Sequence, residues 1–248
     1  MAPSFSDLKV ILLQARNTKD MESQEQDCFL ERSKLERHQL STFNVAHGNL
    51  IETDNFFDGY DAFFIGGAGE YSVAKDYDWT PWAMKLIRRA YDVEIPTFGS
   101  CWGHQLIARG LGGTVEHDPD RAELGCHHVR LTEQGMGDEL FAAFPDSFLV
   151  NMGHHDRVTT LPDNGIELAD NDSQPFEAFR IENRAIYGTQ FHSELDARRE
   201  RERLIRYRSY YVEQLHSEEV FQNIMNTLAE TTDVDHLMFD FLTKFAVR

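Results

Sequence analysis

Short apolar runs alternate with helical patterns through the first half of the chain. The runs that predict strands are 8–14, 39–45, 60–70 and 94–100. In the run 60–70 the strand ends in a glycine turn. The segments that predict helices are 20–38, 81–91, which has a proline at its start, and 103–113, which closes with glycines. This alternation predicts a parallel sheet that helices cover on both faces.

The second half has a different pattern. Shorter, partly antiparallel strands with turns between them are predicted at 127–132, 146–154, 165–171, 175–183 and 185–192. From Leu195 onward the chain has helical spacing and almost no turn residues, which predicts two or three helices. We therefore expect an α/β fold with a mostly parallel, flavodoxin-like central sheet in residues 1–195. We expect residues 196–248 to form a helical C-terminal extension packed on the same domain.

Composition narrows the class of protein. A chain of 248 residues suits one large α/β domain, and its 42 acidic and 24 basic residues give a net charge of −18. This charge argues against binding to nucleic acids or anionic membranes. Three widely spaced cysteines predict reduced thiols rather than disulfides. With no basic leader and no apolar segment long enough to span a bilayer, we expect a cytoplasmic location.

The sequence Gly99-Ser100-Cys101-Trp102-Gly103 lies where a predicted strand meets a predicted helix. It fits the G-x-nucleophile-x-G pattern of a strained strand-to-helix turn, where small neighbours avoid clashes. The helix N-terminus favours a thiolate and a developing oxyanion, with the N–H of Trp102 as one donor. The turn at Gly66-Gly67 is the natural second donor. A buried structural cysteine in a glycine-rich loop fits the same short pattern.

A thiol nucleophile needs a base and a group that orients the base. His192 and Glu194 end the last predicted strand, where positions i and i+2 point to the same face. The carboxylate is therefore expected to fix the imidazole tautomer while the other ring nitrogen faces Cys101. An isolated pair of this kind at a strand end is more often a surface pair, so the prediction depends on the cysteine turn.

Five segments in this order resemble the class I glutamine amidotransferases, in particular the standalone proteins similar to the glutaminase half of GMP synthase. They are FFIGGAGEYSV, GSCWGHQLIARGLGGTV, AELGCHHVRLT, NMGHHDRVTTLP and TQFHSELD. The resemblance covers roughly residues 8–195 and implies the family fold, with a Cys–His–Glu triad of Cys101, His192 and Glu194. It also implies hydrolysis of the glutamine side-chain amide through a γ-glutamyl thioester.

The resemblance implies further roles around the triad. The oxyanion would lie between the backbone N–H groups of Gly67 and Trp102. The amino and carboxylate ends of glutamine would be held by Gln105 and by the backbone of Gly153, His155 and Asp156.

Three features depart from the family pattern. Ser193 replaces the usual proline, Gly153 and His155 replace a serine and a glycine, and residues 196–232 look like an insertion. His155 adds bulk near the predicted substrate pocket. A standalone γ-glutamyl peptidase or hydrolase with the same triad is therefore an open alternative. So is a non-catalytic binding or regulatory protein that retains the fold.

Other sites and partners are also constrained. We expect no cofactor and no metal site, because the chain lacks HExxH and CxxC patterns and adjacent histidines on a strand face opposite sides. We expect no room in the chain for an ATP-dependent synthetase domain, so either a separate synthetase subunit receives the ammonia or the protein acts alone on a γ-glutamyl compound. The charged run 196–208 and the acidic positions Glu22, Glu25, Asp27 and Glu31 are interpreted as solvated helix faces. A helix that docks a partner is an open alternative for the run, because apolar and aromatic surface is offered by Ile205, Tyr207, Tyr210, Tyr211 and Leu215.

Overall fold

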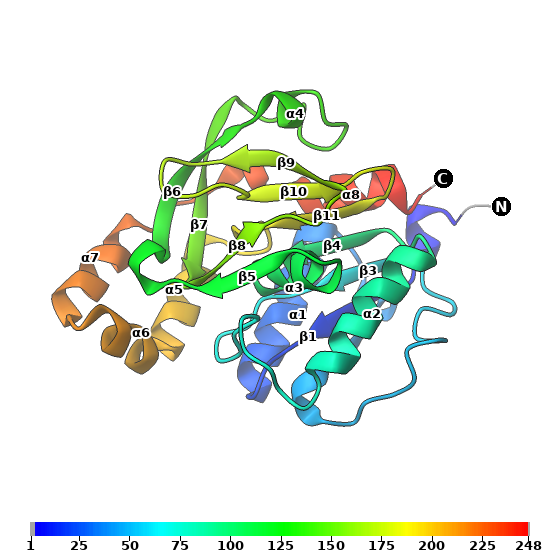
Figure 1. The fold of residues 1–248 in the computed structure, drawn as a ribbon, viewed down its shortest axis with the longest axis horizontal. Coiled ribbons are helices and arrows are strands. Elements are labelled where there is room, and N and C mark those ends of the chain that lie inside the picture. The colour runs from blue at the N-terminus through cyan, green and yellow to red at the C-terminus, as the bar shows by residue number, and fades with distance from the viewer. Residues whose placement is uncertain (1–2, 248) are drawn as a thin grey trace.

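The computed structural model describes residues 3–247. Within that range the main sheet has nine strands in the order β2-β1-β3-β4-β11-β10-β9-β6-β7 (Figure 1). The parallel half consists of β2 (Leu40–Asn44), β1 (Val10–Gln14), β3 (Ala62–Ile65), β4 (Thr97–Ser100) and β11 (Ile186–Thr189). The antiparallel extension consists of β10 (Ala178–Ile181), β9 (Gly165–Asp170), β6 (Glu123–Leu131) and β7 (Ser147–His154). The predicted α/β fold with a largely parallel central sheet is confirmed, and the parallel order is the flavodoxin-like one.

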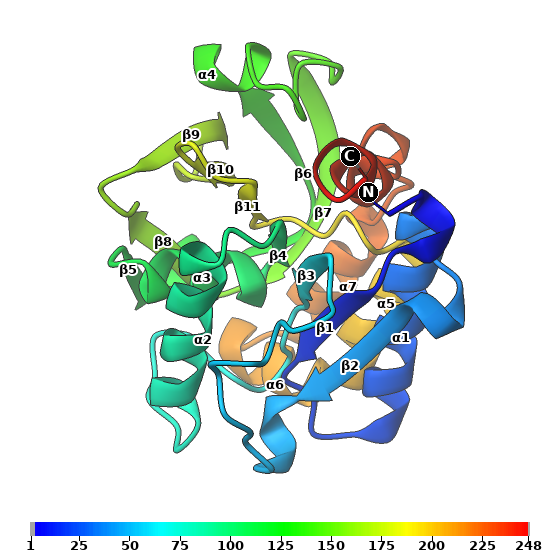
Figure 2. The ribbon, with the colours of Figure 1, turned by 90° about the vertical axis from the view of Figure 1, so that its right-hand side faces the viewer.

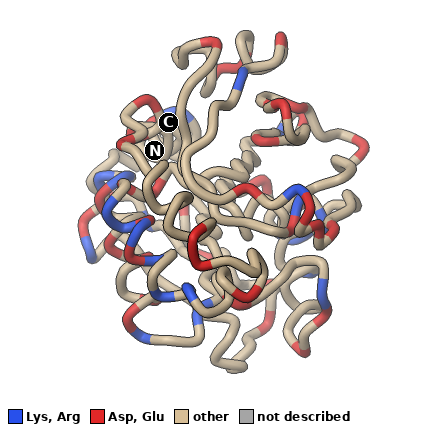
Figure 3. The backbone as a smooth tube through the Cα atoms, turned by 90° about the vertical axis from the view of Figure 1, so that its left-hand side faces the viewer, with Lys and Arg blue, Asp and Glu red and all other residues tan. Residues whose placement is uncertain are grey.

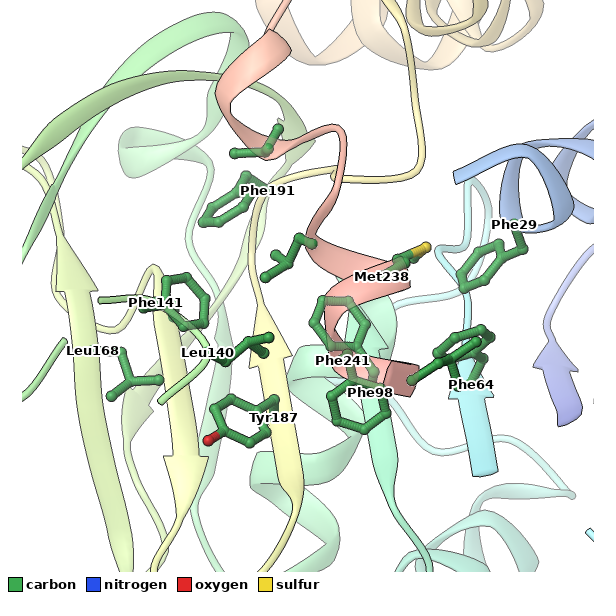
Figure 4. Packing of buried hydrophobic residues seen from close by; sticks show 14 of the residues in the cluster. Phe29, Phe64, Phe98, Leu140, Phe141, Leu168, Tyr187, Phe191, Met238 and Phe241 are labelled. Carbon is green, nitrogen blue, oxygen red and sulfur yellow. The ribbon is translucent and has the colours of Figure 1, made fainter. Parts of the chain in front are cut away.

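Helices cover both faces of the parallel half, as Figure 2 shows. One face carries α2 (Thr80–Asp92) and α3 (Trp102–Gly110), and the other carries α1 (Lys19–Ser33) and α8 (Leu237–Phe245). Alternate residues of β3 serve the two sides, since Phe63 packs toward α2 and α3 and Phe64 toward α1 and α8. Figure 4 shows Phe64 among Phe29 of α1 and Phe241 of α8. Burial on both faces explains the continuous apolar runs.

The C-terminal segment forms more helices than expected. After residue 195 come α5 (Ala197–Arg206), α6 (Arg208–Leu215) and α7 (Glu218–Thr227), and α8 brings the α-helices of the described segment to four. The prediction of two or three was wrong because the breaks carry no glycine or proline. The break between α5 and α6 falls at Tyr207, and α6 ends at Leu215, followed by His216 in a left-handed conformation. Ser217 then caps α7 through its side chain.

The helices α5 to α7 pack on the rest of the chain. A separate apolar cluster joins Leu204, Tyr207 and Tyr211 to Met21 of α1 and Leu124 of β6. Figure 3 shows acidic and basic positions interspersed on the side that carries these helices. A domain division after residue 195 stays a prediction. None of the helices formed by residues 3–247 combines the length and apolarity needed to cross a membrane.

Several short elements were not predicted. Residues of β5 (Thr114–His117) pair with β8 (Asp156–Thr160) in a separate two-stranded sheet, and α4 (Glu133–Met136) is a single turn. The short 3₁₀ helices are η1 (Phe5–Asp7), η2 (Arg37–Gln39), η3 (Val45–His47), η4 (Pro119–Arg121) and η5 (Thr232–Val234). The last predicted strand ends early, at Thr189, so His192 and Glu194 lie in the irregular segment that follows β11. The strand-based reason given for their pairing is therefore wrong.

Candidate active site

Cys101 occupies a sharp corner between β4 and α3. Its backbone has φ 50° and ψ −98°, a strained conformation for a residue with a side chain. The flanking glycines are required by close contacts: a Cβ at Gly103 would lie 2.4 Å from the backbone oxygen of Ile65, and one at Gly99 would lie 2.5 Å from the carbonyl carbon of Gly103. The backbone N–H of Cys101 donates to the backbone oxygen of Thr189 at 2.8 Å, which fixes this turn to β11. The predicted nucleophile turn thus has a physical basis in this packing.

The pair His192 and Glu194 forms despite the absence of a strand. His192 Nδ1 donates to Glu194 Oε1 at 2.7 Å, and both side chains are buried. The backbone N–H of His192 donates to the Asn151 oxygen of β7 at 3.1 Å, and Thr189 Oγ1 donates to the Phe191 oxygen at 2.9 Å. These two bonds hold the irregular segment in place. The contact therefore comes from tertiary anchoring rather than from strand alternation.

The imidazole of His192 and the carboxylate of Glu194 shift each other's pKa toward the charged form. Burial disfavours a charged imidazole, but the Glu194 carboxylate and the Cys101 sulfur outweigh it and hold the pKa of His192 well above its usual value. Burial likewise disfavours a charged carboxylate, but His192, Arg203 and the Ser100 hydroxyl hold the pKa of Glu194 well below its usual value. The imidazole and the carboxylate therefore stabilise each other's charged forms.

Two further side chains contact Glu194 that the sequence did not identify. Ser100 Oγ donates to Glu194 Oε2 at 2.7 Å, and Arg203 Nη1 of α5 donates to Glu194 Oε1 at 3.2 Å. Arg203 is only 5% exposed, so the interpretation of 196–208 as a wholly solvated face was wrong. Nothing in the sequence distinguishes Arg203 from the other arginines of this run, and only the structure shows that it shares a buried helix face with Glu200, Leu204 and Tyr207.

A second buried ion pair lies beside the glycine turn. Arg16 Nη2 and Glu25 Oε1 are 2.6 Å apart, and both side chains are buried. The same oxygen of Glu25 accepts the N–H of Gly67 at 3.0 Å. The interpretation of Glu25 as part of a solvated helix face was therefore wrong. The N–H of Gly67, predicted as an oxyanion donor, has a carboxylate acceptor in this structure.

A cavity of about 90 Å³ opens onto the cysteine. Of the sequence-predicted residues, it is lined by Cys101, Trp102, Gln105, Gly153, His155 and Asp156. The other three, Gly67, His192 and Glu194, are not among its lining residues. Aromatic side chains that also line the cavity are Tyr71, Tyr77, Tyr210 and Tyr211. Helix α6 therefore contributes directly to the pocket, although the sequence assigned its segment no role.

The polar groups around the cavity are partly engaged. Gln105 Nε2 donates to the backbone oxygen of Asp156 at 2.7 Å and to Gln190 Oε1 at 3.0 Å. Gln190 Nε2 in turn lies 3.7 Å from Cys101 Sγ. The His155 ring stacks on Tyr211, and burial lowers its pKa to about 4. Gln190 lies in the segment TQFHSELD that carries the family resemblance, but the sequence analysis assigned it no role of its own.

The family model and the curated relatives that match this chain agree on one family. The family model described as "Glutamine amidotransferase class-I" matches residues 20–211. The GMP synthase [glutamine-hydrolyzing] of Staphylococcus carnosus is 37% identical over 157 residues, which are 63% of this chain and 29% of that protein. A GMP synthase [glutamine-hydrolyzing] subunit from Pyrococcus abyssi is 36% identical over 45% of this chain and 57% of that protein. The chain therefore spans less than two thirds of the length of these curated relatives.

Solved structures agree in fold. A glutamine amidotransferase from Thermotoga maritima has a TM-score of 0.75 at 20% identity and covers 97% of this chain and 98% of its own. A glutamine amido transferase from Methylobacillus flagellatus has a TM-score of 0.69 at 17% identity, with 98% and 96% covered. The similarity in fold thus extends to the C-terminal helices.

Proposed function

The chain belongs to the class I glutamine amidotransferase family, and from this premise we propose that it hydrolyses the side-chain amide of glutamine to glutamate and ammonia. The observation that carries the proposal is the strained corner at Cys101 together with the buried pair of His192 and Glu194. A nucleophile, a base and an orienting carboxylate are the groups that acyl transfer requires.

In the proposed mechanism Cys101 gives its thiol proton to His192 and its sulfur attacks the side-chain carbonyl carbon of glutamine. The tetrahedral adduct collapses as His192 donates a proton to the leaving nitrogen, which gives ammonia and a γ-glutamyl thioester. Water then attacks the thioester with His192 as the base, which releases glutamate and regenerates the thiol. Glu194 keeps Nδ1 of His192 protonated and holds the ring, because a carboxylate only accepts hydrogen bonds.

The oxyanion is proposed to lie between the backbone N–H groups of Trp102 and Gly67. Trp102 is the first residue of α3, where N–H groups have no acceptor within the helix. Gly67 must exchange its Glu25 acceptor for the oxyanion, since one N–H cannot serve both fully. Glu25 therefore competes with the transition state for this donor in the proposed mechanism.

Substrate recognition is proposed in the cavity that opens onto Cys101. Gln105 and the backbone of Gly153, His155 and Asp156 would hold the amino and carboxylate groups of glutamine, as the family resemblance implies. Support comes from their shared position, because all four line the same cavity as Cys101.

The proposed acceptor of the ammonia is a synthetase subunit in another chain. The Pyrococcus abyssi relative is one subunit of a GMP synthase, which supports a division of labour between chains. A family member of this kind would supply ammonia to a partner that carries out the synthetic reaction.

A second candidate is hydrolysis of a γ-glutamyl peptide or amine by the same residues. The aromatic rim of the cavity favours it, because Tyr77, Tyr210 and His155 offer apolar surface to a leaving group larger than ammonia. The chemistry at Cys101 would be unchanged, with an amine as the first product.

Both candidates are tested by one assay of product release. The purified chain is incubated with glutamine and with a panel of γ-glutamyl peptides and amines, with Cys101→Ala as the control. Ammonia from glutamine supports the amidotransferase proposal, and amine from the γ-glutamyl compounds alone supports the second candidate. Failure to turn over any of them, with and without synthetase subunits of the family added, would contradict both.

A further inference from the structure

A second group of reactive side chains lies beside the proposed active site and has no step in the proposed hydrolysis. It comprises Glu123 at the start of β6, His154 at the end of β7 and Glu177 just before β10. Each residue offers one ligand atom, and these three atoms lie within 4.8 Å of one another. We propose that they bind a divalent transition-metal ion, and we call this group the Glu123–His154–Glu177 site.

The first argument is the burial of two neighbouring carboxyl groups away from any lysine or arginine. The exposed fractions of Glu123, His154 and Glu177 are 2%, 4% and 0%. Two carboxylates buried together are strongly unfavourable unless an opposite charge offsets them. Among the residues that the structure describes, Glu123 has only histidine nitrogens within 4 Å, from His127 at 3.8 Å and His154 at 3.4 Å, and Glu177 has no basic group within that distance. A divalent cation would neutralise both carboxylates without any lysine or arginine.

The second argument is the orientation of the His154 ring. Nδ1 lies 3.0 Å from the backbone oxygen of Asp156, which can only accept, so Nδ1 carries the proton of the neutral ring. This leaves a lone pair on Nε2, which is buried and has no hydrogen-bond partner. A histidine that donates its other N–H to a backbone carbonyl is the usual arrangement at a metal.

Distance supports the same conclusion. His154 Nε2 lies 3.4 Å from Glu123 Oε2, and the contact does not form a hydrogen bond. Two ligand atoms at about 2.1 Å from a tetrahedral ion lie about 3.4 Å apart. The pair is therefore spaced as two ligands of one small cation.

The carboxylates are held by neutral donors behind them. Asn171 Nδ2 donates to Glu123 Oε1 at 2.7 Å and to Glu177 Oε1 at 3.1 Å, and Gln174 Nε2 also donates to Glu123. Glu177 Oε2 is buried without any hydrogen-bond partner. One amide thus fixes both carboxylates while a free oxygen of Glu177 remains for a cation, as outer-shell donors do in metal sites.

The donor set indicates the class of ion and its role. One imidazole with two carboxylates suits Zn²⁺ or Mn²⁺. The ligands come from three separate segments, so the expectation of no metal, which considered local motifs and adjacent histidines, did not include this combination. His154 lies between Gly153 and His155, which line the cavity. We assign the ion a positioning role that holds this segment against β6 and the residue before β10.

The test measures metal content and thermal unfolding of the full chain, not turnover. Chelator-treated protein is loaded with Zn²⁺ or with Mn²⁺, separated from free metal, and assayed by mass spectrometry for bound metal. We expect about one ion per chain and a higher unfolding temperature with the preferred metal. Glu177→Gln should lose the ion, and Asn171→Ala should weaken its binding about 10- to 100-fold. Glu182→Gln, at an exposed glutamate outside the site, should match the parent protein.

Two outcomes would overturn the proposal. One is a parent protein that retains neither metal and shows no thermal shift with either. The other is Glu177→Gln that keeps the metal, or that unfolds at the same or a higher temperature than metal-treated parent protein. The second result would mean that Glu177 shares a proton with Glu123, a role that a glutamine amide can replace. Because neither readout involves glutamine, failure here leaves the proposed hydrolysis intact.

Discussion

Replacement of Glu194 by glutamine separates the electrostatic role of this residue from its shape. The carboxylate accepts hydrogen bonds from His192 at 2.7 Å, Ser100 at 2.7 Å and Arg203 at 3.2 Å. Glutamine keeps one acceptor oxygen and turns the other into a donor. His192 and Arg203 both donate to Oε1, so a glutamine oxygen at that position still accepts from both, and the Ser100 hydroxyl can rotate to accept from the new N–H. The change therefore removes the negative charge that faces His192 and Arg203 while it keeps the shape and the contacts.

The magnitude follows from these contacts. Loss of the group that orients the base in a comparable triad lowers turnover about 10⁴-fold, and we expect a decrease of about 10³- to 10⁴-fold in Glu194→Gln. Removing one member of a buried ion pair costs about 3–5 kcal/mol of unfolding free energy. Arg203 would be left with Glu25 at 3.9 Å as its nearest carboxylate. The variant should still fold if the parent has the usual margin of stability.

Acid sensitivity gives a second readout. The pKa of Glu194 in the folded chain lies below its ordinary value of 4.5, so its contribution to stability is present above pH 4.5 and is lost as pH falls below it. Glu194→Gln should therefore lose less stability on acidification than the parent protein. The same change should lower the pKa of His192, because the neighbouring negative charge is removed.

The assays are turnover of glutamine, chemical denaturation at several pH values, and a nuclear magnetic resonance titration of His192. Glu182→Gln is the matched control, since it makes the same chemical change at an exposed position. A folded Glu194→Gln with unchanged turnover and an unchanged His192 pKa would refute the assignment of Glu194 to the mechanism.

Three further predictions concern single side chains. A glutamine-mimicking diazo ketone should label Cys101 and spare Cys28, whose pKa burial raises to about 12; peptide mapping that finds the label on Cys28 would contradict this. Gly103→Ala should lower the unfolding free energy by about 1–3 kcal/mol, because the added Cβ meets the Ile65 backbone. The control Gly137→Ala, whose added Cβ has its nearest contact at 3.7 Å, should change the unfolding free energy by under about 0.5 kcal/mol. Equal effects of the two variants in chemical denaturation would disprove the packing argument. Burial lowers the pKa of His104 from 6.5 to about 3, so on acidification the unfolded chain protonates this imidazole before the folded chain does. The unfolding free energy should therefore fall by up to about 5 kcal/mol as the pH drops from 6.5 to 3. His104→Phe should flatten that part of the profile of unfolding free energy against pH, and an unchanged slope would contradict the assignment.

The parallel half of the fold could be predicted because its strands are buried on both faces. The run 8–14 became β1 and 94–100 became β4, since a continuous apolar stretch between helical patterns has few other solutions. The turn at Cys101 was also predictable from local sequence, because a nucleophile with a strained backbone in a tight strand-to-helix turn needs small residues beside it.

Features that depend on tertiary contacts could not be predicted. His192 and Glu194 meet because Asn151 and Thr189 anchor the segment, and neither anchor has a local sequence signature. Arg203 and Glu25 resemble surface charges in the sequence, since each lies in a charged helix and is buried only by its distant partners. Buried ion pairs between separate helices therefore escape prediction from local periodicity.

The proposed mechanism depends on a covalent bond between the Cys101 sulfur and the substrate acyl group. The most direct test is to quench the protein in acid during turnover of glutamine and to map adducts by peptide mass spectrometry. The mechanism predicts a γ-glutamyl group on the peptide that contains Cys101, absent in Cys101→Ala and strongly reduced in His192→Ala. An adduct on a different residue, or glutamine hydrolysis by Cys101→Ala at the parent rate, would contradict it.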